Sequence, residues 1–252
     1  MSGNETAPGL LGVIGGMGPQ ATCLFYSQII DRTEASCDQE HIPMIILNHS
    51  TMPDRTAAIL SGQGDLVFSL LLRDAKQLER DGATAIAIPC NTSHYFADRL
   101  QASIGIPIIN MVRETAKVMA ARGLHRVGIL ATDGTVKTGL YQRECQALGM
   151  ECVVPSKEIQ AIVMHIIYDE IKKGRPGSRA LFAKIDNELR RQGCDGAILA
   201  CTELSCFAAE HDLLEYYTDA MGILVEQSIL ACGGRLRAPV QSNCDAINAV
   251  YP

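Results

Sequence analysis

The chain contains two short aliphatic runs that each end in a cysteine with a threonine close behind it. The first is AIAIPCNT at residues 85–92, and the second is GAILACTE at residues 196–203. Each run is short and is bounded by an Asp-Gly turn, as is typical of a fully buried parallel strand. A residue at the carboxyl end of such a strand lies in the crevice where open α/β sheets bind ligands. The pattern therefore predicts an α/β fold in which Cys90 and Cys201 line a binding cleft.

An internal repeat indicates that the two strands belong to duplicated lobes. The segment GVIGGMG, which starts at Gly12, resembles GILATDG, which starts at Gly128, and the two cysteines follow these glycines at similar intervals. A repeat of about 110 residues indicates a duplicated domain rather than a solenoid. We therefore expect two pseudo-symmetric lobes, each a parallel sheet flanked by helices, with the active site in the cleft between them. The first lobe is expected to comprise residues 9–112 plus 219–252, and the second residues 113–218.

Hydrophobic periodicity and turn residues predict the individual elements of these lobes. Strands are expected at residues 10–14, 42–47, 85–88, 107–109, 127–131, 152–154, 196–200 and 213–217. Helices are expected at residues 19–33, 65–80, 91–102, 112–122, 136–148, 156–173, 178–192 and 219–232, with a short helix after Pro53.

The composition excludes several classes of function. With 252 residues, 47% hydrophobic and 20% charged, the chain has the composition of an ordinary soluble globular protein. A net charge of -6 argues against a nucleic-acid partner. No apolar run approaches the ~18 residues needed to cross a bilayer, and residues 1–8 do not resemble a signal peptide, so we expect no membrane partner and a cytoplasmic location. The 10 cysteines include no C-x-x-C pair, so neither disulfides nor a metal site is expected.

The first glycine loop formally matches the dinucleotide fingerprint G-x-G-x-x-A from Gly16 to Ala21. That fingerprint also requires an acidic residue ~20 positions later, at the end of the second strand. Here the second strand ends in Asn48, His49 and Ser50. The pattern favours a glycine turn that lets the backbone approach a small ligand over a nucleotide site. No cofactor is expected.

The paired cysteines are suited to one reaction in particular. Related lobes would bring Cys90 and Cys201 to opposite sides of one bound molecule, so that one removes a proton from a stereocentre and the other returns a proton on the opposite face. Such a pair needs one thiolate and one thiol, and a helix N-terminus after each cysteine is expected to lower a thiol pKa from about 8.5. Nearby amides, with Asn91, Thr92 and Thr202, would hold a carboxylate whose charge grows as the carbanion forms.

Several motifs together resemble the aspartate/glutamate racemases, a family of cofactor-independent amino-acid racemases. They are GGMGP at residues 15–19, PDRT at 53–56, PCNTSH at 89–94, YDEIKKG at 168–174 and ACTE at 200–203. The resemblance implies two catalytic cysteines, Cys90 and Cys201, no pyridoxal phosphate and often a homodimer. It also implies substrate contacts from Asn91, Thr92, Ser93 and Thr202 and from the cationic Arg55 and Lys172. We add Met17, Thr132 and Glu203 to the expected substrate-binding residues.

Two departures place the chain within this family. Glutamate racemases typically carry an aspartate in the first glycine loop and a histidine after the second Cys-Thr, where this chain has Gly15-Gly16 and Glu203. The sequence therefore resembles the aspartate racemases. Alternatives are a glutamate or broad-specificity amino-acid racemase, a related thiol-dependent isomerase, or a non-catalytic amino-acid-binding protein. Arg55 would otherwise pair with Asp54 or cap a loop, and its replacement by alanine is expected to leave folding unaffected.

Overall fold

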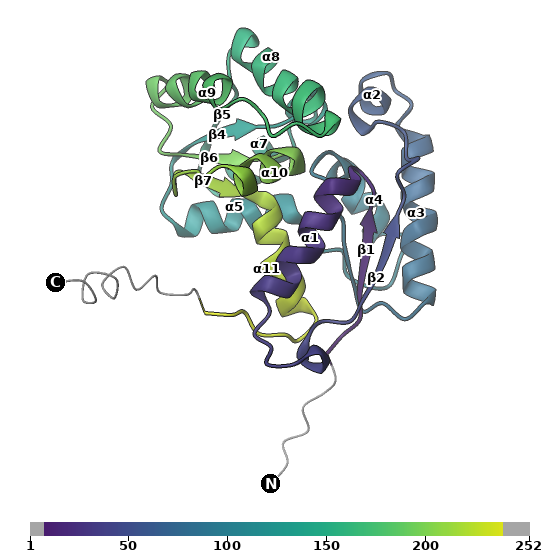
Figure 1. The fold of residues 1–252 in the computed structure, drawn as a ribbon. Coiled ribbons are helices and arrows are strands. Elements are labelled where there is room, and N and C mark those ends of the chain that lie inside the picture. The colour runs from purple at the N-terminus through teal and green to yellow at the C-terminus, as the bar shows by residue number, and fades with distance from the viewer. Residues whose placement is uncertain (1–7, 239–252) are drawn as a thin grey trace, which may run out of the picture.

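Two separate parallel sheets form the framework of the molecule in a computed structural model, which describes residues 8–238 (Figure 1). The first sheet has the order β2-β1-β3, and the second has the order β5-β4-β6-β7. Flanking helices complete the α/β architecture, as predicted. The strands are β1 (Leu11–Gly15), β2 (Met44–Asn48), β3 (Ala85–Ala87), β4 (Arg126–Leu130), β5 (Glu151–Val153), β6 (Gly196–Leu199) and β7 (Tyr217–Asp219).

The strands form where the chain is aliphatic and shielded on both faces. All residues of β1, β3 and β6 are buried, as expected for parallel strands covered by helices on both sides. The helices are α1 (Pro19–Arg32), α2 (Arg55–Leu60), α3 (Gly64–Arg80), α4 (Ala97–Gln101), α5 (Met111–Ala121), α6 (Asp133–Thr138), α7 (Leu140–Ala147), α8 (Lys157–His165), α9 (Arg179–Arg191), α10 (Thr202–Glu210) and α11 (Ala220–Ala231).

The two sheets share a hydrophobic core. Leu11 and Val13 of β1 belong to the same buried cluster as Val127 and Ile129 of β4, and α11 packs against both α1 and α5. Figure 1 shows α1 and α11 side by side between the sheets, with α8 and α9 on the far side of the second sheet. The division into lobes at 9–112 plus 219–252 and at 113–218 stays a prediction, and residues 239–252 lie outside the described residues.

Two predicted strands are shorter than expected. The segment 107–109 contributes only an isolated bridge between Ile86 and Ile108, because Pro107 has no N–H to donate. The last strand begins at Tyr217 rather than at residue 213, since Leu214 is 66% exposed and does not join the sheet.

Three predicted helices are interrupted. The segment 136–148 is divided between α6 and α7 by Gly139, whose φ of 67° lies in the left-handed region that ends a helix. The segment 91–102 is a short 3₁₀ turn, Thr92–Phe96, followed by α4. The segment 156–173 passes from α8 through a π-helical turn, Ile166–Glu170, into a 3₁₀ turn, Ile171–Lys173. Single π turns are frequent at functional sites.

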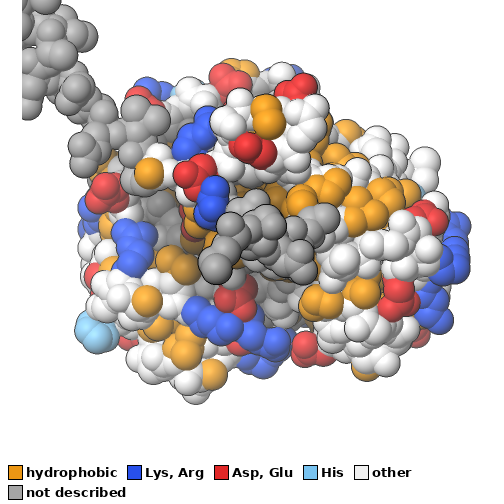
Figure 2. All heavy atoms as spheres, turned by 90° about the horizontal axis from the view of Figure 1, so that it is seen from below, with side chains coloured by type: hydrophobic (Ala, Val, Ile, Leu, Met, Phe, Trp, Pro, Cys, Tyr) orange, Lys and Arg blue, Asp and Glu red, His pale blue; other side chains and the backbone are white. Residues whose placement is uncertain are grey.

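The surface carries charges of both signs. Figure 2 shows Lys and Arg side chains interspersed with Asp and Glu on the face that it presents. Among the helices of residues 8–238, none has the length and apolar character needed to span a membrane.

Candidate active site

Cys90 and Cys201 line the same narrow pocket, although they come from different sheets. Cys90 lies three residues beyond the end of β3, and Cys201 is the N-cap of α10 and lies two residues beyond the end of β6. Both are buried, at 6% and 5% exposure, and the pocket between them has room for about one water molecule. The other lining residues are Met17, Asp54, Arg55, Thr56, Asn91, Thr92, Thr132, Tyr168, Lys172, Thr202 and Glu203.

A wider vestibule adjoins this inner pocket. It has a volume of about 300 Å³ and extends from the glycine loop and the start of α1 to the 3₁₀ turn that carries Lys172. Four charged residues, Asp54, Arg55, Lys172 and Glu203, line both spaces. They therefore form the boundary that a ligand passes between the vestibule and the thiols.

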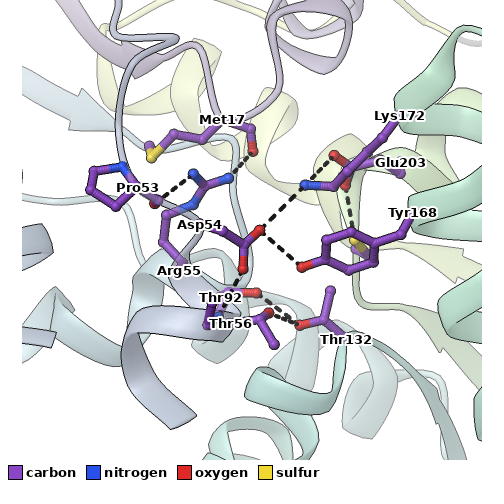
Figure 3. Close-up of polar contacts among 12 residues, drawn as sticks. Met17, Pro53, Asp54, Arg55, Thr56, Thr92, Thr132, Tyr168, Lys172 and Glu203 are labelled. Atoms are coloured by element: carbon purple, nitrogen blue, oxygen red, sulfur yellow. Dashed lines mark hydrogen bonds and ion pairs between the residues drawn. The ribbon is translucent and has the colours of Figure 1, made fainter. Parts of the chain in front are cut away.

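Lys172 lies between two carboxylates at this boundary (Figure 3). Its Nζ is 3.4 Å from Glu203 Oε1 and 4.0 Å from Asp54 Oδ2, and it also lies over the ring of Tyr168. Burial lowers the pKa of Lys172, but Glu203 and Cys201 raise it by more, so the ammonium stays charged. Tyr168 donates a hydrogen bond to Asp54 at 3.0 Å, which joins the π turn to the start of α2.

Arg55 is held by backbone carbonyls rather than by Asp54. Nη1 donates to the carbonyls of Met52 and Pro53, and Nη2 donates to the carbonyl of Met17 (Figure 3). Asp54 instead caps α2 by accepting the N–H of Ala57. Arg55 thus ties the glycine loop to the segment before α2. Its Nε is buried and has no hydrogen-bond partner among the described residues, so this donor is available to a ligand.

Asn91 presents a second unsatisfied donor to the pocket. Its Oδ1 accepts a hydrogen bond from the hydroxyl of Tyr141, which fixes the orientation of the amide. Its Nδ2 is buried without a partner in the described part of the chain. Buried polar groups are rarely left unsatisfied, so two such donors beside the thiols point to an acceptor-rich ligand.

A cluster of threonine hydroxyls joins the two sheets at the same pocket. Thr132 Oγ1 lies 3.1 Å from Thr56 Oγ1 and 3.0 Å from Thr92 Oγ1, and Thr92 also contacts Thr135. Thr132 caps α6 by accepting the N–H of Thr135. Each hydroxyl both donates and accepts, so the cluster can adjust its protons to a ligand.

The two thiols have different surroundings. Burial, and then the neighbouring Glu203 carboxylate, raise the pKa of Cys201 well above its ordinary value, while Lys172 lowers it by less. The expectation that a helix N-terminus would lower this pKa is therefore wrong for Cys201. The element that follows Cys90 is a short 3₁₀ turn, Thr92–Phe96, rather than a long helix.

His94 supports the backbone at Cys90 rather than the thiol. Its Nδ1 lies 2.9 Å from the Cys90 carbonyl oxygen, and its Nε2 accepts the N–H of Met111 at the start of α5. Burial lowers the pKa of His94, so the ring is neutral with its proton on Nδ1.

The structure brings ten of the eleven expected site residues to the inner pocket. The exception is Ser93, which is buried beneath it and donates to the sulfur of Met17. Asp54, Thr56 and Tyr168 also line the pocket and were not expected as site residues. All three lie in the motifs PDRT and YDEIKKG, and their membership of these motifs was the sequence signal that could have identified them. Within residues 8–238, no three His, Cys, Asp or Glu side chains gather in a group able to hold a metal.

Two buried thiols reach one pocket from the strand ends of two parallel sheets, and this arrangement defines the chain as an α/β protein with a paired-thiol site. The chain belongs to the Asp/Glu/Hydantoin racemase family, whose model matches residues 14–227, and the expected family is thereby confirmed.

Similar proteins include racemases of more than one specificity. The chain is 28% identical over 202 residues to the broad specificity amino-acid racemase RacX of Bacillus subtilis, covering 78% of this chain and 86% of that protein. Its fold matches Picrophilus torridus aspartate racemase with a TM-score of 0.78 and 27% identity, covering 91% of this chain and 96% of that one. An aspartate racemase homologue from Pyrococcus horikoshii matches with a TM-score of 0.70 and 25% identity, covering 88% and 98%. Glutamate racemase from Campylobacter jejuni shares the fold, with a TM-score of 0.58, 16% identity and coverage of 90% and 87%.

Proposed function

We propose that the chain racemises an acidic amino acid, aspartate in particular, without a cofactor and through a two-base mechanism. The observation that carries this proposal is the shared pocket of Cys90 and Cys201, which reach it from two different sheets. A protein that only binds an amino acid has no need of two buried thiols in one pocket. A decarboxylase needs to protonate only one face and so needs only one.

In the proposed reaction the thiolate of one cysteine removes the Cα proton and the thiol of the other delivers its own proton to the opposite face. After one turnover the two cysteines have exchanged protonation states, and proton exchange returns the enzyme to its starting form. By family resemblance, Cys90 serves the D enantiomer and Cys201 serves the L enantiomer. Asn91 Nδ2 and Arg55 Nε are the donors available to stabilise the α-carboxylate as negative charge develops.

An acidic substrate is supported by the cations at the boundary of the pocket. A second carboxylate buried without a partner would be costly, and Lys172 and Arg55 offer positive charge beside the thiols. The similarity to aspartate racemases agrees with this choice.

A broader substrate range is a second candidate. The similarity to a broad specificity racemase and the vestibule of about 300 Å³ beyond Lys172 both favour side chains longer than that of aspartate. A panel of aspartate, glutamate and neutral amino acids, assayed by chiral chromatography, separates the two candidates.

The decisive experiment measures racemisation and deuterium incorporation at Cα in D₂O for the parent, Cys90→Ala and Cys201→Ala. Both variants should lose racemisation, because each face needs its own proton carrier. Cys194→Ala is the matched control, since Cys194 is buried near the other end of β6 and does not line the pocket. Substantial two-way racemisation by either single variant would overturn the two-base mechanism.

Two further parts of the proposal have their own tests. Independence from cofactors predicts that activity survives dialysis against a chelator and that added pyridoxal phosphate has no effect. The homodimer rests on family resemblance alone, and sedimentation equilibrium tests it.

A further inference from the structure

The carboxylate of Glu203 has two different partners, one for each oxygen. Oε2 accepts a hydrogen bond from the Cys201 thiol at 2.9 Å, and Oε1 faces the ammonium of Lys172 at 3.4 Å. Glu203 is 5% exposed, so these contacts are shielded from solvent. Glu203 and Cys201 both lie at the start of α10, which fixes their separation.

The surroundings of Cys90 are of the opposite sign. Arg55 lines the same pocket as Cys90, and its pKa is raised because Cys90 and Asp54 together outweigh the effect of burial, which lowers it. Among residues 8–238, no carboxylate accepts a hydrogen bond from Cys90 Sγ. One thiol of the pair therefore lies beside a carboxylate, and the other lies beside a guanidinium.

We propose that Glu203 is a positioning residue that keeps the proton on Cys201, so that Cys201 is the acid of the pair in the free enzyme. This inference rests on the proposed two-base function and assigns a resting state to the pair. In that state Cys90 accepts the Cα proton, and the proton held between Cys201 and Glu203 passes to the opposite face. The bond from Cys201 sulfur to hydrogen breaks, a Cα–H bond forms, and Cys201 is left as a thiolate beside Glu203. Repulsion between these two anions favours prompt reprotonation of Cys201.

Several ionisable groups surround Cys201, and each shifts its pKa in a direction set by the charge of the group. Lys172, from the 3₁₀ turn, opposes Glu203 because it favours the thiolate. Burial and then Glu203 also raise the pKa of Cys206, one turn further along α10, to about 12. The remaining ionisable groups around the pair are Asp54 and Arg55 of the segment entering α2, Cys90 after β3, Tyr141 of α7, Tyr168 of the π turn and Asp219 at the end of β7.

The test is the alkylation rate of each cysteine, resolved by peptide mass spectrometry after brief treatment with iodoacetamide at a fixed neutral pH. Only the thiolate reacts, so the rate follows the thiolate fraction. Glu203→Gln removes the charge and should increase alkylation of Cys201 roughly tenfold, the change that one pKa unit produces. Alkylation of Cys90 in the same sample should change little. Glu203→Asp, which keeps the charge, should restore part of the parental protection.

A second variant moves the same thiol in the opposite direction. Lys172→Met removes the opposing cation and should reduce alkylation of Cys201. The thiolate ultraviolet absorbance that Cys201→Ala removes, measured across pH in each background, gives the pKa of Cys201 independently of reagent access. Faster alkylation of Cys201 in Glu203→Gln together with slower alkylation in Lys172→Met supports the inference, even if one of the variants is poorly active.

Each remaining outcome is decisive. Equal increases at Cys90 and Cys201 would mean that the pocket has opened, and unchanged reactivity of Cys201 in Glu203→Gln would mean that Glu203 does not hold its proton. Either result overturns the inference while Cys90→Ala and Cys201→Ala still test the two-base function separately. The ratio of kcat/KM for the two enantiomers cannot replace the alkylation measurement, because the equilibrium constant of a racemisation fixes that ratio.

Discussion

Replacement of Arg55 by alanine should reduce both activity and stability, and the structure gives the size of each effect. Arg55 is 7% exposed and its guanidinium donates to three backbone carbonyls, so its loss removes three charge-assisted hydrogen bonds. Such bonds contribute ~1.5–3 kcal/mol each when both partners are buried, but the adjoining vestibule lets water replace part of them. We expect a loss of about 3 kcal/mol in the free energy of unfolding. For a chain of this size that is a fall of roughly 6–12 °C in Tm.

The effect on catalysis should be of similar size. Arg55 Nε is an unsatisfied donor in the pocket, and loss of a buried cation that faces a carboxylate costs about 2–4 kcal/mol in transition-state terms, or roughly 30- to 900-fold in kcat/KM. Arg55→Lys should recover only part of each loss, because an ammonium cannot reproduce the planar fork that spans three carbonyls.

The assay pairs differential scanning calorimetry with chiral chromatography of aspartate. Arg99→Ala is the matched control, since Arg99 forms an exposed ion pair with Asp65 and should change stability by less than about 0.5 kcal/mol. A normal Tm with lost activity would show that the three carbonyl contacts contribute no stability. A lowered Tm with parental kcat/KM would show that Arg55 only braces the loops, and the argument for a substrate contact would fail.

Three further changes test other parts of the site. Asn91→Leu should lower kcat/KM by roughly 10- to 100-fold, because it removes a pocket donor and leaves the hydroxyl of Tyr141 without its acceptor; parental kinetics would remove Asn91 from the site. Cys206 has a folded-state pKa raised to about 12 by burial and Glu203, so the stability it contributes is present below the unfolded-state value near 8.5 and is lost as pH rises toward 12. Cys206→Ala should therefore flatten the alkaline fall in the free energy of unfolding, as measured by urea titration across pH. Asp54→Asn keeps the cap of α2 but frees Lys172 from one anion, so KM for aspartate should fall about two- to fivefold. A rise in KM would instead place Asp54 against the substrate ammonium.

The framework and the thiol pair were predictable because they depend on local patterns. Aliphatic runs bounded by Asp-Gly turns predict buried parallel strands, and a residue just beyond such a strand must lie at one edge of its sheet. The repeat then predicts that Cys90 and Cys201 occupy corresponding edges. The positions of the strands and of the two cysteines both follow from the path of the chain, which local sequence patterns specify more directly than they specify side-chain contacts.

The contacts that set the chemistry were not predictable in the same way. Arg55 could be expected in the site, but its bonds to the carbonyls of Met17, Met52 and Pro53 depend on how two loops approach each other. The sequence alone led us to expect that its replacement would leave folding unaffected, whereas those bonds lead us to predict a loss of stability. The position of Cys201 at a helix N-terminus suggested a lowered pKa, whereas burial and Glu203, which depend on tertiary structure, raise it.

The charged boundary of the inner pocket supports the proposal of an acidic substrate on energetic grounds. Asp54 and Glu203 balance Arg55 and Lys172, and the pocket behind them has room for about one water molecule, so substrate entry must separate Lys172 from at least one carboxylate. An acidic amino acid replaces that lost contact, because its side-chain carboxylate can pair with Lys172. A neutral amino acid offers no such replacement and would leave Lys172, whose side chain is 26% exposed, with one carboxylate partner fewer. The same ion pairs that close the pocket would therefore disfavour neutral substrates.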